Sequence, residues 1–243
     1  MQKYLYQDLY ELEDIHWWHK AKRKLVSLLL EKYLNGKPSK ILDIGCGTGK
    51  NLEVFSKFGQ VFGIDNSTDA IAFCKKRGLK GVTLGSIEKI PYKNSSFEII
   101  TALDVLEHVD DSKALREISR ILKKEGVLII TVPAFQWLWS KWDEVLYHKR
   151  RYTEKTLSKI LKNNGFKIVK TSYIYSFLVL PSLIIRGIKK IFYKDYYPSD
   201  FKLSNKIIND FLITLANIER IFIINFKIPF GTSVVAVAKK NNR

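Results

Sequence analysis

This chain has few of the residues that specify small disulfide-bonded or secreted proteins. Among its 243 residues are only two cysteines, Cys46 and Cys74. Two cysteines cannot make a disulfide framework, and their spacing matches no metal-binding motif. The first residues, Met1 to Tyr4, lack the apolar core of a signal peptide. These absences predict a cytoplasmic protein of a reducing compartment, without a bound metal ion.

Long apolar runs and internal repeats are also absent. The most apolar stretch, residues 173–185, contains Pro181 and is too short to span a bilayer. Hydrophobic residues nevertheless make up 46% of the chain, enough for one domain with additional segments. Acidic residues are scarce, and the formal charge of +17 favours anionic partners such as phosphates, lipids or nucleic acids. The alternative is that lysine is simply the preferred surface residue, because the lysines are spread over most segments.

The most informative segment is a glycine-rich turn that follows a predicted strand. Residues 40–44 form an apolar run that contains Asp43, and glycines follow at alternate positions. Glycine adopts positive φ and has no Cβ, so a ligand can lie against the backbone, and the next helix offers it free N–H groups. A second apolar run, residues 61–64, ends in Asp65, at the spacing where an acid reaches a ribose. Together these features predict a nucleoside pocket.

The glycine spacing narrows the choice of nucleoside. A dinucleotide-binding turn reads G-x-G-x-x-G, which would require a glycine at Lys50. The observed pattern, D-x-G-x-G-x-G from Asp43 to Gly49, resembles motif I of the class I S-adenosylmethionine-dependent methyltransferases. This resemblance covers residues 38–133 and implies S-adenosyl-L-methionine as the cofactor. The cofactor-binding residues that it implies are Trp18, Arg23, Asp43, Gly45, Cys46, Gly47, Asp65, Asn66, Ser86, Ile87, Leu103 and His108.

Short apolar runs alternate with helical patterns from Ile41 to Val132, which indicates a parallel sheet with crossover helices. The resemblance implies an α/β fold, a Rossmann-like doubly wound sheet of seven strands whose late strands pair antiparallel. The predicted parts are an N-terminal helical lid (1–37), a cofactor-binding methyltransferase domain (38–173 and 229–243) and a helical insertion between the last two strands (174–228).

The insertion carries two apolar stripes with helical spacing. The first comprises Ile184, Ile185, Ile188, Ile191 and Phe192, with Arg186, Lys189, Lys190 and Lys194 beside it. The second comprises Ile207, Ile208, Phe211, Leu212, Leu215, Ile218, Ile221 and Phe222. Either these helices pack on each other and cap the substrate cleft, or a basic amphipathic face lies on an anionic membrane surface. The second alternative places the protein at the inner face of the membrane.

The candidate catalytic residues follow the fifth predicted strand. Residues 133–152 contain three tryptophans, an acid pair and a basic run. Histidine titrates near neutrality, so His148 is the predicted general base; the alternative is a structural histidine that anchors the loop. Arg151 is predicted to bind an anionic group of the acceptor, or instead to pair with Asp143 or Glu144.

The acceptor is narrowed by motifs that the chain lacks. The segment after the fourth predicted strand has neither the tetrad of enzymes that methylate amino groups of nucleic acids nor the cysteine of RNA cytosine methyltransferases. What remains is methyl transfer to a small-molecule, sugar-linked or lipid-linked acceptor, at oxygen. An RNA methyltransferase, a NAD-dependent dehydrogenase and a non-catalytic nucleoside-binding scaffold are the alternatives.

Overall fold

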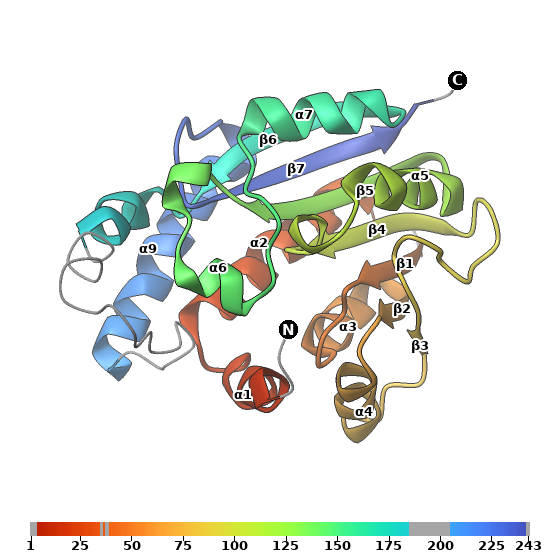
Figure 1. The fold of residues 1–243 in the computed structure, drawn as a ribbon, viewed down its shortest axis with the longest axis horizontal. Coiled ribbons are helices and arrows are strands. Elements are labelled where there is room, and N and C mark those ends of the chain that lie inside the picture. Colours follow the sequence, from red (N-terminus) through yellow and green to blue (C-terminus); the bar gives the residue numbers. More distant parts are fainter. Residues whose placement is uncertain (1–3, 35, 37–38, 185–204, 242–243) are drawn as a thin grey trace.

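A computed structural model describes residues 4–34, 36, 39–184 and 205–241. Its centre is a seven-stranded sheet with the order β3-β2-β1-β4-β5-β7-β6 (Figure 1). The strands are β1 (Ser39–Ile44), β2 (Gly59–Asp65), β3 (Val82–Leu84), β4 (Phe97–Leu103), β5 (Leu122–Pro133), β6 (Phe166–Ile174) and β7 (Ser233–Lys240). Strands β1 to β5 are parallel, and β7 is antiparallel to both β5 and β6. The predicted Rossmann-like sheet with a late antiparallel strand is confirmed.

Helices cover both faces of this sheet, and most residues of its central strands β1, β4 and β5 are therefore buried. Figure 1 shows α5 and α7 along one face and α2 and α9 along the other. The helices are α1 (Tyr4–Leu12), α2 (Trp17–Leu34), α3 (Lys50–Phe55), α4 (Thr68–Lys76), α5 (Asp111–Ile121), α6 (Lys141–Val145), α7 (Glu154–Asn163) and α9 (Lys206–Asn225). Two buried clusters result, one between the sheet and α5 and α7, the other between the sheet and α2 and α9.

The N-terminal helices and α9 are tied to each other, although they lie far apart in the sequence. The side chain of Asn209 in α9 accepts a hydrogen bond from the backbone N–H of Trp17 at 2.8 Å. Ala216 and Ile223 of α9 lie in the same buried cluster as Trp17 and the strand residue Val235. The predicted lid and the described part of the insertion therefore share one layer, while the limits drawn between the three predicted parts stay a prediction.

The second predicted stripe lies on the exposed side of α9. Six of its members are exposed, namely Ile207, Ile208, Phe211, Ile218, Ile221 and Phe222. The buried side instead holds Asn209, Ala216, Glu219 and Ile223. Whether the two insertion helices pack on each other stays a prediction, because the described residues include only the second of them. The first stripe, apart from Ile184, and the lysines beside it lie outside those residues.

Candidate active site

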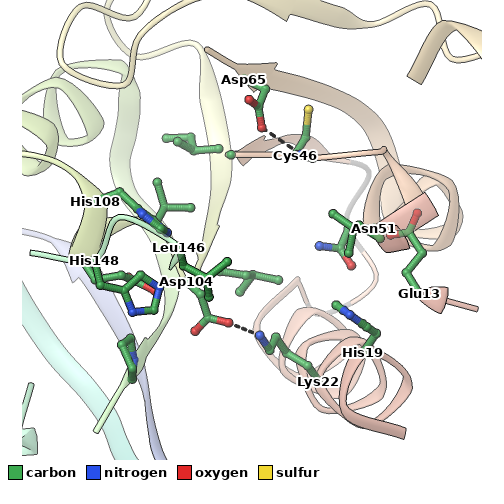
Figure 2. A pocket seen from close by; sticks show the side chains of 18 of the residues that line it. Glu13, His19, Lys22, Cys46, Asn51, Asp65, Asp104, His108, Leu146 and His148 are labelled. Carbon is green, nitrogen blue, oxygen red and sulfur yellow. Dashed lines mark hydrogen bonds and ion pairs between the residues drawn. The ribbon is translucent and has the colours of Figure 1, made fainter. Parts of the chain in front are cut away.

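A cavity of about 610 Å³ opens at the carboxyl ends of β1, β2 and β4. The glycine-rich turn after β1 forms one wall, and α1 and the start of α2 form another. The loop that contains α6 completes the lining on the side of His148 (Figure 2). The carboxyl edge of a parallel sheet is where α/β folds bind ligands, since loops from several strands meet there.

The structure brings the predicted site residues together at this cavity, with one exception. Those that line it are Trp18, Arg23, Gly45, Cys46, Gly47, Asp65, Asn66, Ser86, Ile87, Leu103, His108, His148 and Arg151. The exception is Asp43, which lies behind the wall, where its carboxylate accepts hydrogen bonds from Thr101 Oγ1 at 2.5 Å and Asn51 Nδ2 at 3.4 Å. Burial raises the pKa of Asp43 to about 7. Asp43 thus supports the site through Asn51, which does line the cavity.

The turn after β1 requires glycine for steric reasons. Gly45 has φ +67°, and a Cβ there would lie 2.5 Å from Val105 Cγ2. Gly49 has φ +90°, and its Cβ would lie 2.5 Å from Leu79 Cδ1. Both the backbone conformation and the lack of space exclude larger residues. The turn therefore keeps its backbone close to the cavity.

Asp65 is fixed at the end of β2 by the backbone around it. Its Oδ2 accepts a hydrogen bond from the N–H of Gly47 at 2.9 Å, and its Oδ1 accepts one from the N–H of Ser67 at 2.9 Å. Burial raises the pKa of this carboxyl, and the two backbone donors oppose the rise. Each oxygen keeps a second lone pair for a ligand hydroxyl. The acid is therefore held in place and can still accept hydrogen bonds from the cavity.

The N-terminal segment contributes polar residues that the sequence analysis did not identify. Glu13 is buried, accepts a hydrogen bond from Thr48 Oγ1 and pairs with Arg77 at 2.6 Å. Glu13 thereby holds the end of α1 against the turn of residues 45–49. The predicted residue Arg23 donates to the backbone oxygen of Glu13. No local sequence pattern indicates Glu13, because its partners come from two later loops.

A second missed feature is an ion pair across the cavity. Lys22 binds Asp104, as the dashed line in Figure 2 marks. The Lys22 ammonium also lies 3.2 Å from the centroid of the Trp18 ring, a cation–π contact. Burial lowers the pKa of Lys22, and Asp104 opposes that shift. The pair joins α2 to the end of β4 and leaves Trp18 held against the cavity.

His148 is held by a buried carboxylate in the loop of α6. Its Nδ1 lies 2.9 Å from Asp143 Oδ1. Arg151 donates to the same carboxylate from Nε at 2.7 Å and from Nη2 at 2.9 Å. Burial alone would raise the pKa of Asp143, but the bonds from His148 and Arg151 hold it well below its usual range. Because Asp143 takes the Nδ1 side of the ring, Nε2 is the nitrogen available to a ligand.

The structure shows one of the two sequence-based interpretations of Arg151, the ion pair with Asp143. The guanidinium pairs with Asp143 and also donates to the carbonyl of Ala134 at 3.1 Å. The pairing alternative is therefore observed, and the contact of Arg151 with an anionic group of the acceptor stays a prediction. Arg151 acts in this structure as a positioning residue for Asp143 and, through it, for His148.

Residues 42–130 match a family described as a methyltransferase domain. The uncharacterized protein MJ0638 of Methanocaldococcus jannaschii is 34% identical over 184 residues, which are 74% of this chain and 77% of that protein. The ubiquinone/menaquinone biosynthesis C-methyltransferase UbiE of Campylobacter jejuni is 29% identical over 48% of this chain and 52% of its own length. A SAM-dependent methyltransferase structure from Archaeoglobus fulgidus superposes with a TM-score of 0.59, covering 90% of this chain and 94% of that one, at 22% identity. The chain belongs to the class I S-adenosylmethionine-dependent methyltransferases.

The residues of this methyltransferase fit its cofactor, S-adenosyl-L-methionine. Asp65 can accept hydrogen bonds from ribose hydroxyls, and the turn at Gly45 and Gly47 brings bare backbone to the cavity. Ser86 and Ile87 line the same end, where the resemblance predicts the adenine. Membership in this family displaces the dehydrogenase interpretation of the glycine-rich turn. The cofactor contacts of individual residues stay predictions.

Proposed function

We propose that this methyltransferase methylates a hydroxyl oxygen of a small, sugar-linked or lipid-linked acceptor. The observation that supports this proposal is that Asp65 and His148 line the same cavity. The ring of His148 is held there by Asp143. A donor nucleoside and an acceptor hydroxyl can therefore share one cavity. A shared cavity favours the reaction, because it can hold the two reactants at attack distance.

The protein's part in the reaction is to bind and orient the two reactants and to remove a proton from the acceptor. When bound, S-adenosylmethionine supplies a methyl group on a positively charged sulfur. Asp65 and the backbone at Gly45 and Gly47 would hold this donor, and His148 Nε2 would accept the proton that the acceptor hydroxyl releases. Asp143 sets the tautomer of His148 that makes Nε2 the acceptor of this proton. Asp143 also stabilises the charged imidazolium that results.

The cavity lining favours an acceptor with an apolar portion. Trp142, Leu146 and Val109 line it on the side of His148. The name of the relative UbiE places it in quinone biosynthesis and states carbon as the methylated atom, so a quinone-like lipid is a further acceptor of this type. Carbon methylation also requires removal of a proton, and the same histidine would serve it.

The experiment is methyl transfer from isotopically labelled S-adenosylmethionine to a cell extract and to a panel of hydroxyl, amine and carbon acceptors. We expect the label in a small or lipid-extractable hydroxyl compound. His148→Gln should lower turnover about 10²–10⁴-fold while calorimetry with S-adenosylhomocysteine gives a near-parent affinity. Glu144→Gln, at an exposed position of the same loop that does not line the cavity, is the control.

Label in tRNA or rRNA would instead support the RNA methyltransferase alternative, to which the charge of +17 lends weight. Normal turnover of His148→Gln would remove the histidine from the chemistry and leave it as a loop anchor. Cofactor binding without turnover on any acceptor would support the scaffold alternative.

A further inference from the structure

Three side chains with metal-binding atoms converge on one side of the cavity. Glu107, His108 and His148 each offer a ligand atom, and these atoms all lie within 4.8 Å of one another. The two imidazole rings are 4.7 Å apart between centroids and nearly perpendicular, at 74°. Figure 2 shows the two histidines next to each other. All three residues line the cavity, so an ion there would be accessible to a bound acceptor.

Glu107 is the member of this group that most needs a partner. Its side chain is fully buried, at 0% exposed, and neither carboxylate oxygen hydrogen-bonds another described residue. A buried carboxylate without a partner is strongly unfavourable, because it loses the hydration that stabilised its charge. The nearby cations are already engaged, Lys22 with Asp104 and Arg151 with Asp143. A bound cation would give the carboxylate oxygens of Glu107 a partner and would neutralise the negative charge.

His148 is also oriented as a metal ligand is. Asp143 takes Nδ1 of His148 at 2.9 Å, which leaves Nε2 to coordinate. In metal sites the second ring nitrogen of a ligating histidine usually donates to a carboxylate or a backbone carbonyl, which fixes the tautomer. His148 therefore has the outer partner that a ligand would need.

We propose that Glu107, His108 and His148 bind one divalent cation. Two imidazoles and one carboxylate favour Zn²⁺ or Mn²⁺ over Mg²⁺, which prefers oxygen ligands. Ligand atoms around such an ion lie about 3–4 Å apart, given bonds of about 2.0–2.2 Å, so small side-chain adjustments complete the site. Three protein ligands leave coordination positions open toward the cavity.

This inference rests on the proposed function and changes one step of it, the removal of the hydroxyl proton by His148. An acceptor hydroxyl bound to the ion would lose its proton more readily, because the cation stabilises the oxyanion. The proton would then leave to solvent, and His148 would be a ligand of the ion in place of the base. The sequence predicted no metal, since the ligands are split between positions 107–108 and 148 and only folding brings them together.

The test is calorimetry of the metal-stripped protein with Zn²⁺, Mn²⁺ and Mg²⁺ in separate titrations, each repeated with S-adenosylhomocysteine present. We expect one equivalent of Zn²⁺ or Mn²⁺ per chain and much weaker binding of Mg²⁺. Glu107→Gln, which keeps the shape and removes the charge, should weaken binding at least tenfold, as should His148→Gln. Glu144→Gln makes the same change at an exposed residue of α6 outside the three ligands, so it is the control and should bind the ion like the parent.

Circular dichroism and the affinity for S-adenosylhomocysteine report whether each variant is folded. Absence of stoichiometric binding by the folded parent would overturn the inference, and so would binding that survives in both ligand variants. These outcomes leave the proposed function standing, with His148 as the base. Conversely, a protein that binds the ion at these residues but methylates no hydroxyl acceptor would refute the proposed function alone.

Discussion

Buried carboxylates around the cavity differ in character because their partners differ. Asp143 receives bonds from Arg151 and His148, and these partners hold its pKa low despite burial. Asp43 receives only neutral donors, so burial dominates and its pKa rises to about 7. Asp65 lies between the two, with backbone donors that partly offset burial. The same side-chain type can therefore serve as a charged anchor (Asp143), a protonated support (Asp43) or a ligand-binding acid (Asp65).

Asp65→Ala should weaken the binding of S-adenosylhomocysteine by about 2–3 kcal/mol, the range for hydrogen bonds to a charged group. The carboxylate is expected to hold the ribose hydroxyls, and it also fixes the N–H of Gly47. Isothermal calorimetry measures the change. Asp210→Ala, at an exposed acid of α9, is the control. Parent-like affinity of Asp65→Ala would mean that the ribose is bound elsewhere.

Asp43 gives a prediction on pH. Burial raises its pKa from 3.8 to about 7, so the folded protein holds this proton to a higher pH than the unfolded chain. The stability from this group is complete below the unfolded value and is lost as the pH rises toward 7, at no more than about 1.4 kcal/mol per pH unit. Asn cannot titrate, so the free energy of unfolding of the parent minus that of Asp43→Asn should fall between about pH 4 and 7 and then level off.

Denaturant unfolding at a series of pH values measures this difference. Subtracting the variant cancels the titration of all other groups, including the buried histidines, whose effect has the opposite sign. A difference that stays constant from about pH 4 to 7 would show that Asp43 is ionised throughout that range.

The glycine-rich turn and Asp65 could be predicted from sequence because their signals are local. Strand, turn, helix and second acid follow one another within a short stretch, and each has a steric or hydrogen-bonding reason. The residues that were missed, Glu13, Asp104 and Glu107, depend on contacts between distant segments. Glu13, for example, meets Thr48 and Arg77 only after α1 folds over the turn.

Among the elements, α9 shows how a polar side chain can override an apolar pattern. Its apolar stripe left open whether that side is buried or exposed, and the structure buries Glu219 and Asn209 on the other side. Glu219 accepts hydrogen bonds from the backbone N–H groups of Tyr175 at 2.6 Å and Ser176 at 2.7 Å, just after β6 ends. These N–H groups would otherwise be buried without partners, an unfavourable arrangement. Hydrogen-bond demand therefore sets the rotation of α9, which periodicity alone could not reveal.

Glu219→Ala should lower the free energy of unfolding by about 2–3 kcal/mol, because it leaves the two N–H groups and the Ser176 hydroxyl unpaired. Glu219→Gln keeps an acceptor oxygen and should lose less. Urea unfolding followed by circular dichroism measures both, with Glu31→Ala at an exposed position of α2 as the control. Equal stability of Glu219→Ala and Glu31→Ala would show that the rotation of α9 has another cause.

At the scale of the whole molecule, an apolar surface coincides with a strongly basic chain. No helix among the described residues has the length and apolar character needed to cross a bilayer. The exposed side of α9 nevertheless presents Ile218, Ile221 and Phe222, and Phe226 just beyond the helix is also exposed. Lys32 and Lys170 donate to the carbonyls of Ile224 and Phe226, so positive charge gathers at the same end of α9. Apolar side chains beside lysines favour weak attachment to an anionic lipid surface.

This attachment, which remains a proposal, can be tested by flotation with vesicles that contain anionic lipid. We expect the protein to float with the vesicles at low salt and to be released at high salt, because each lysine near the surface contributes about 1 kcal/mol that salt screens. The double variant Ile221→Glu/Phe222→Glu should abolish flotation, since it places charge on the face that would insert. Leu84→Glu makes the same kind of change at an exposed apolar residue of the edge strand β3 and should float like the parent. Flotation that persists in the double variant, or none at low salt, would leave the exposed side of α9 without a role at membranes, and a lipid-linked acceptor would lose its structural support.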